Sequence, residues 1–173
     1  ENYYNVELDP TGESHLIIFL DSITGLEAGD EIGVFDEMGV LNTVDDGDDV
    51  EHGEVLVGAA VWDGDANDQG TVIEISAIMS VDLSDFGGPI TNGAVDGNNI
   101  LIKVYDVSTE TEMMASAEFD IGGEFGDIFT TVTSLSFEGY GCTDPLACNY
   151  DEDAVFDDGS CAENDCAGEC GGD

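Results

Sequence analysis

The sequence predicts an all-β fold: an antiparallel β-sandwich, immunoglobulin-like or jelly-roll in style, followed by a small, loop-rich C-terminal segment stapled by disulfides. Three observations favour this class. Short stretches of β-branched and aromatic residues recur through residues 1–138, no amphipathic helix pattern stands out, and all five cysteines lie in the last 32 residues. The cysteine boundary predicts a β-sandwich domain over residues 1–138 and a Cys/Asp-rich tail over residues 139–173.

Eight segments carry the strand signal, and Gly, Asp and Asn punctuate the chain between them. The last segment alternates clearly, with Phe129, Thr131 and Thr133 on one face. The immunoglobulin Cys-Trp-Cys pattern is absent, so the topology stays open. The expected strands are residues 4–8, 15–20, 31–35, 54–62, 71–79, 100–105, 112–119 and 129–137.

The charge balance excludes several classes of function. The chain has 41 acidic residues, one Lys, no Arg and a formal net charge of -40. A nucleic-acid binder needs basic residues to neutralise phosphates, and attraction to an anionic membrane needs them too. Phosphorylated ligands are disfavoured for the same reason. No apolar run approaches the ~20 residues that span a bilayer, so we expect no membrane insertion.

A charge of this size strains a compact state through self-repulsion, so something must offset it. Bound Ca²⁺ is one answer, and a saline medium that screens the carboxylates is the other. Screening predicts stability that rises smoothly with any salt, whereas calcium sites saturate at a defined number of ions.

The segment 63–74 has the strongest calcium pattern. Oxygen donors fall at its first, third and fifth positions, and a Glu stands at the twelfth, which resembles the spacing of an EF-hand loop. Asp68 replaces the usual Gly at the sixth position and the flanks read as strands, so we expect a calcium loop between strands. The alternative is a solvated hairpin loop, because turns use the same residues. The candidate ligands are Asp63, Asp65, Asn67, Gln69 and Glu74.

Two further acidic clusters are candidate calcium sites. Five carboxylates in seven residues repel one another unless a cation or water screens them, and in the tail oxygen donors alternate with spacers between cysteines that would pre-organise the loop. The candidates are Asp45, Asp46, Asp48 and Asp49 in the first cluster, and Asn149, Asp151, Asp153, Asp157 and Asp158 in the second.

The five cysteines indicate disulfides in an oxidising compartment. Zinc is the alternative, but no pair has CxxC spacing and the tail has no His. The number is odd, so one thiol stays free or bonds outside this segment. The pairing cannot be chosen from the sequence. The residues are Cys142, Cys148, Cys161, Cys166 and Cys170.

The tail also resembles a known repeat. Residues 141–161 read GCTDPLACNYDEDAVFDDGSC and are similar to the GCTDPxACNYxxxAxxDDGSC repeat of secreted surface proteins from marine and Bacteroidota-like bacteria. Residues 165–172 resemble the DCAGxCGG units that follow it. The resemblance implies an extracellular, multi-domain setting, with such units in tandem as stalk, spacer or attachment elements, and implies no activity. Residues 28–36, 57–61 and 96–106 are weakly similar to β-sandwich modules of the same class.

Catalysis has little support in the sequence. His15 and His52 are the two histidines, and neither stands in a catalytic motif. With so many acids, any carboxylate pair is arithmetically available and carries no signal. We therefore expect that the chain is not an enzyme. Its start at Glu1 fits a processed secreted protein or an excised fragment.

Two functions remain. The first is a secreted, calcium-stabilised structural or adhesive protein of the cell surface, a subunit of an extracellular filament or surface layer. It would self-associate as a homo-oligomer or polymer, or join other surface proteins, through the tail or through strand addition by residues 3–8. The alternative is a carbohydrate-binding module that uses exposed aromatics, with Trp62 the first candidate and Tyr3, Tyr4 and Tyr105 behind it. Trp62 also ends an apolar stretch, which favours a core role.

Overall fold

The computed structural model describes residues 2–45, 48–63, 72–152, 154, 156–157, 161–162 and 170. The chain divides into two compact units, Glu1–Leu135 and Ser136–Asp173. The strands are β1 (Ser14–Phe19), β2 (Glu31–Val40), β3 (His52–Val61), β4 (Ile73–Ile78), β5 (Ile100–Asp106), β6 (Thr111–Ile121), β7 (Phe129–Phe137), β8 (Tyr140–Gly141) and β9 (Phe156–Asp157), with one 3-10 turn, η1 (Ser84–Phe86).

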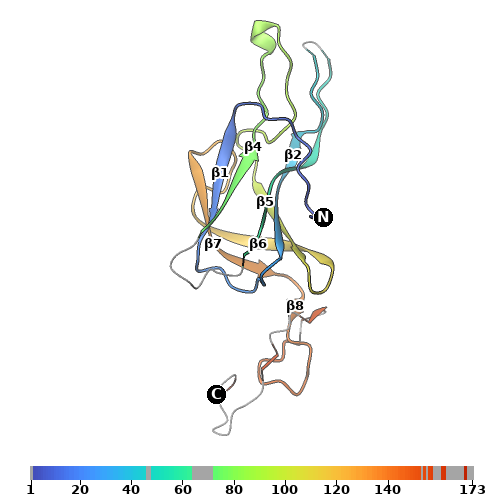
Figure 1. The fold of residues 1–173 in the computed structure, drawn as a ribbon, viewed down its shortest axis with the longest axis vertical. Helices are drawn as coiled ribbons and strands as arrows, with labels where there is room; N and C mark the ends of the chain where they lie inside the picture. Colours follow the sequence, from blue (N-terminus) through green and yellow to red (C-terminus); the bar gives the residue numbers. More distant parts are fainter. Residues whose placement is uncertain are drawn as a thin grey trace. The chain divides into compact units, whose positions relative to one another are not determined.

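The all-β prediction is confirmed, and one seven-stranded sheet forms the first unit (Figure 1). Its order is β3-β2-β5-β6-β7-β1-β4. The sheet is mixed, because the first strand lies between β7, to which it is parallel, and β4, to which it is antiparallel. Sheet curvature brings the two end strands together: a Cβ on Gly58 of β3 would lie 2.5 Å from Ile75 Cγ2 of β4.

The core lies between the two halves of this curved sheet. In β4, Ile75 and Ala77 are buried while Glu74 and Ser76 face solvent, which is the period of two expected of a half-buried strand. Inward positions of the other strands are mostly apolar as well. The most buried side chains include Ile17, Phe19, Ile32, Val34, Val57, Ile102, Val104 and Val132.

Seven of the eight expected strands are present, and the prediction for residues 4–8 is wrong. That segment lies along the unit without pairing as a strand. The backbone N–H groups of Tyr3 and Tyr4 donate instead to the two carboxylate oxygens of Glu31, at 2.9 and 3.0 Å. The side chains do alternate, with Tyr4 buried against Phe35, Val6 and Leu8 half-buried, and Asn5 and Glu7 exposed, but the segment pairs with no strand that the structure describes.

Two long loops project from one end of the first unit (Figure 1). We call residues 41–51 and 79–94 the arm. Val44 and Ile90 exchange two backbone hydrogen bonds of 2.9 Å, and Val40 and Gly93 exchange another two, so the loops support each other. η1 lies in the second loop, where Phe86 is almost fully exposed.

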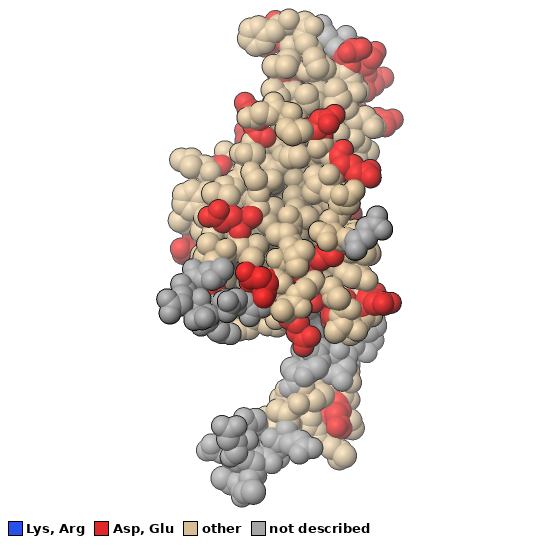
Figure 2. Space-filling model, in the orientation of Figure 1, with Lys and Arg blue, Asp and Glu red and all other residues tan. Residues whose placement is uncertain are grey.

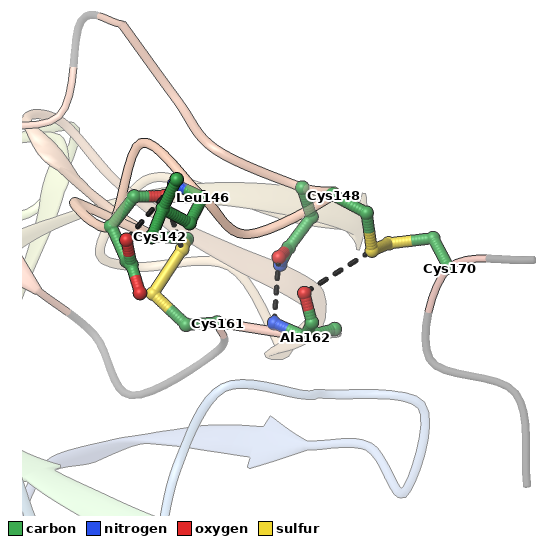
Figure 3. Close-up of a disulfide and its surroundings, with 8 residues drawn as sticks. Cys142, Leu146, Cys148, Cys161, Ala162 and Cys170 are labelled. Carbon is green, nitrogen blue, oxygen red and sulfur yellow. Dashed lines mark hydrogen bonds between the residues drawn. A yellow bond between two sulfur atoms is a disulfide. The ribbon is translucent and has the colours of Figure 1, made fainter. Parts of the chain in front are cut away.

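The second unit is small and loop-rich. Its parallel strands β8 and β9 are two residues each, and Asp151 N–H donates to the carbonyl of Cys142 at 2.9 Å. Two disulfides close it, as Figure 3 shows: Cys142–Cys161 and Cys148–Cys170. Covalent closure compensates for a segment too short to build much of a core.

Candidate functional site

The first acidic loop is described only at its ends. Asp63 follows β3, and Glu74 lies in β4 with its side chain exposed, on the face opposite Ile75. The other candidate ligands, Asp65, Asn67 and Gln69, lie outside the described residues. Calcium binding by this loop therefore stays a prediction.

The second acidic cluster lies in the arm. Asp45, Asp48 and Asp49 are exposed, and the N–H of Asp48 donates to the carbonyl of Asp45 at 3.1 Å, as in a turn. Asp46 lies outside the described residues. A solvated turn and a calcium loop both accommodate this arrangement.

The third acidic cluster, in the tail, is also only partly within the described residues. Asn149 Oδ1 accepts the N–H of Ala162 at 2.8 Å, so this predicted ligand oxygen already holds two loops of the tail together. Asp151 is exposed and Asp157 belongs to β9, while Asp153 and Asp158 lie outside the described residues. Among the residues that the structure describes, no group of three or more His, Cys, Asp or Glu is placed to hold a metal ion.

Four of the five predicted cysteines are paired, which selects a pairing that the sequence left open. The bonds Cys142–Cys161 and Cys148–Cys170 leave these sulfurs unable to act as zinc thiolates (Figure 3). The carbonyl of Ala162 accepts the N–H of Cys148 at 3.0 Å and strengthens the staple. Cys166 lies outside the described residues.

The aromatic residues are used within the first unit. Trp62 is 3% exposed and exchanges backbone hydrogen bonds with the turn 29–30, so its ring has no face for a sugar to stack on. Tyr3 stacks on Tyr105 with ring centroids 3.9 Å apart, and Tyr4 OH donates to Glu112 Oε1 at 3.0 Å. Burial and the nearby Glu112 raise the pKa of Tyr4 well above its usual value, so Tyr4 is a neutral anchor at physiological pH.

The two histidines occupy different environments. His15 is 1% exposed, and both of its ring nitrogens have a partner. Its Nε2 lies 2.9 Å from Thr130 Oγ1, and its Nδ1 lies 3.2 Å from the backbone N of Gly126. Burial lowers the pKa of His15 and outweighs the opposing effect of Asp127. His52 is exposed, and its Nδ1 lies 3.1 Å from the carbonyl of Met38, to which it donates.

The buried carboxylates are satisfied by hydrogen bonds from N–H donors. Asp36 is fully buried and accepts from Met38 N, Val95 N and Asn98 Nδ2 at 2.8 to 3.0 Å. Asp30 and Glu31 are also buried and accept backbone N–H groups. N–H donors thus occupy the places around these carboxylates that cations would take in a less acidic chain.

The single Lys of the chain forms an ion pair and lies over an aromatic ring. Lys103 Nζ lies 2.6 Å from Glu54 Oε1 and 4.5 Å from the centre of the Phe35 ring, with only 13% of its side chain exposed. The visible face in Figure 2 carries scattered acidic side chains and no basic one. An anionic ligand would meet only like charge there.

Two concave regions of the first unit, both larger than the one lined by Asp36 and Asn99, combine several polar side chains. One, of about 560 Å³, has the carboxylates of Glu13, Asp96 and Asp127 in its walls beside His15. The other, of about 410 Å³, is lined by four segments distant in sequence: Asn5 with Glu7 and Leu8, residues 41–42 of the arm, residues 54–56 of β3, and Asn92 of the arm. We call the second the amide groove, because Asn5, Asn42 and Asn92 line it. Sequence reasoning missed it, since no local pattern joins these asparagines.

No protein-family model, curated protein or solved structure matches this chain. Within the described residues, no helix has both the length and the apolar character needed to cross a membrane.

Proposed function

We propose that this chain is a secreted structural or adhesive protein of the cell surface that acts as a subunit of an extracellular filament or surface layer. The observation that carries this proposal is the pair of disulfides in an acidic tail, Cys142–Cys161 and Cys148–Cys170. Such bonds persist outside the reducing cytosol and stiffen a segment that spaces or attaches domains.

Two features support contacts between subunits. β3 and β4 end the sheet, so each has one side without a hydrogen-bonded neighbour in the described part of the chain. Sheet ends are where strand addition occurs, and because Gly58 of β3 packs against Ile75 of β4, an added strand would have to pair with the parts of these strands away from that contact. In the tail, Leu146 is 90% exposed, an apolar side chain on a highly charged chain. Residues 3–8 are less suited to strand addition on another subunit than the sequence suggested, because Tyr4 is buried in its own unit.

Calcium belongs to the same proposal. Like charges on neighbouring subunits repel, and divalent cations held by the acidic loops would reduce that repulsion. The exposed carboxylates of Asp45, Asp48 and Asp49 in the arm are available for this purpose.

Light scattering of the oxidised chain in EGTA and in millimolar CaCl₂, followed by electron microscopy, tests the proposal. We expect the mass to grow in calcium and to fall again when EGTA is added. Leu146→Ser should weaken assembly if the tail makes the contact, whereas Ile128→Ser, which alters a 93% exposed side chain of the first unit, is the matched control. A chain that stays monomeric in both buffers would refute assembly.

A further inference from the structure

The amide groove has polar groups whose hydrogen-bonding capacity is unused. Within the described part of the chain, the side chains of Asn5 and Asn42 make no hydrogen bond, and Asn92 uses only Oδ1, which accepts from Thr43 Oγ1 at 3.1 Å. Each amide supplies two N–H donors and a carbonyl acceptor. The three amides therefore offer both donors and acceptors to a ligand in one concavity.

The groove also has an aliphatic surface. Leu8, Leu41, Val55 and Leu56 line it together with the amides. Two glycines make room for this arrangement in paired positions of β2 and β3: a Cβ on Gly39 would clash with Val55 Cγ1, and one on Gly53 would lie 3.2 Å from Leu41 Cδ1. A volume of about 410 Å³ suits a small ligand or one to two rings of a longer one.

The walls are held in place before any ligand binds. On one side, the burial of Tyr4 and its bonds to Glu31 and Glu112 fix the segment that carries Asn5. On the other, the backbone pair Val40–Gly93 and the bond from Thr43 Oγ1 to Asn92 Oδ1 fix the arm. A prearranged site reduces the ordering cost of binding.

Charge narrows the ligand class. The ionisable side chains in the groove are Glu7 and Glu54, and the nearby Lys103 is bonded to Glu54. An anion would be repelled. A neutral molecule with many hydroxyls fits, because each hydroxyl both donates and accepts, and the C–H face of a sugar ring can cover aliphatic side chains.

We infer that the amide groove binds neutral saccharides, through Asn5, Asn42 and Asn92 and without an aromatic platform. The inference rests on the extracellular setting of the proposed function and gives its adhesive role a ligand class. It does not require self-assembly, so a monomeric chain can still bind.

The test is titration calorimetry of the oxidised chain in EGTA against neutral glucans, mannans and galactans, with uronate and sulfated glycans in parallel. We expect binding of at least one neutral glycan and of no acidic one. Asn5→Ala and Asn42→Ala should each weaken binding about threefold to tenfold, the effect of losing neutral hydrogen bonds. Both side chains are exposed, so folding should be kept, which circular dichroism verifies.

Asn99→Ala is the matched control, because Asn99 is an exposed amide outside this groove and its loss should change the affinity less than twofold. The inference is overturned if no neutral glycan binds, if only acidic glycans bind, or if both groove variants bind like the unmodified chain. Light scattering on the same samples reports self-assembly, so a failure of glycan binding can be distinguished from a failure of assembly.

Discussion

His15 joins β1 to the glycine-rich turn before β7. Since its Nδ1 accepts the N–H of Gly126, its proton resides on Nε2, which donates to Thr130 Oγ1. Thr130 Oγ1 also accepts the N–H of Gly123 at 3.3 Å. A proton on Nδ1 would remove the acceptor for Gly126 and place a charge at a buried position. Phe125 packs edge-on against the imidazole and Asp127 is the acidic neighbour.

This geometry predicts a loss of stability in mild acid. The folded-state pKa of His15 lies below the unfolded value of about 6.5, so the unfolded chain binds a proton that the folded chain refuses. The free energy of unfolding should therefore fall as the pH drops below about 6.5, until the folded pKa is reached. Urea unfolding of His15→Gln should lack this slope whatever its overall stability, while His52→Gln should keep it. An unchanged slope in His15→Gln would contradict the assignment.

The roles of individual acidic residues could be predicted from the sequence only in part. Local spacing predicts candidate ligand loops, but it does not separate carboxylates that face water from those that fasten turns. Asp36 accepts from residues 59 and 62 positions away, and Glu31 from residues 27 and 28 positions away. These donors become neighbours only after the sheet has formed, so the role of either acid could not be predicted.

Among the elements, β3 and β4 can lie close together because Gly58 of β3 has no side chain. Gly58→Ala would place a Cβ 2.5 Å from Ile75 Cγ2 and 3.4 Å from Ala77 Cα, and a β-branched side chain in a packed core has little room to move. We expect a loss of about 1–3 kcal/mol in the free energy of unfolding, measured in urea. Gly53→Ala in the same strand meets the flexible end of Leu41 at 3.2 Å and should cost less. Equal stability of the two variants would contradict this account.

The strands themselves were largely predictable, because half-buried strands impose a period of two on the sequence. Segment 129–137 was located to the residue. Residues 4–8 were misassigned because their side chains alternate between inward and exposed positions, although the N–H groups of Tyr3 and Tyr4 bond to the Glu31 carboxylate and not to a neighbouring strand. The amide groove was beyond prediction, since its walls come from segments that only the sheet order brings together. The tail's disulfides were expected as a class, while their pairing depends on loop geometry.

At the scale of the whole molecule, the question is what balances a net charge of -40. Lys103 neutralises one carboxylate and backbone N–H groups satisfy the few buried ones. The other acids whose side chains the structure describes are exposed, apart from the half-buried Asp106, and mutual repulsion among them favours the unfolded state. Sodium and calcium both relieve this repulsion, but sodium acts by general screening and calcium by binding at sites that saturate.

Thermal unfolding at fixed high NaCl separates these two mechanisms. Ligand binding to the native state alone adds about 4 kcal/mol at a thousandfold excess over Kd, which corresponds to a rise of about 10 °C for a chain of this size. We expect CaCl₂ to raise the Tm relative to EGTA, and MgCl₂ at equal ionic strength to raise it less, because Mg²⁺ sheds its water reluctantly. Asp63→Asn, Asp48→Asn and Asp151→Asn would show which loop is responsible. An equal Tm in all three buffers would mean that the acidic loops are solvated and that salt alone stabilises the fold.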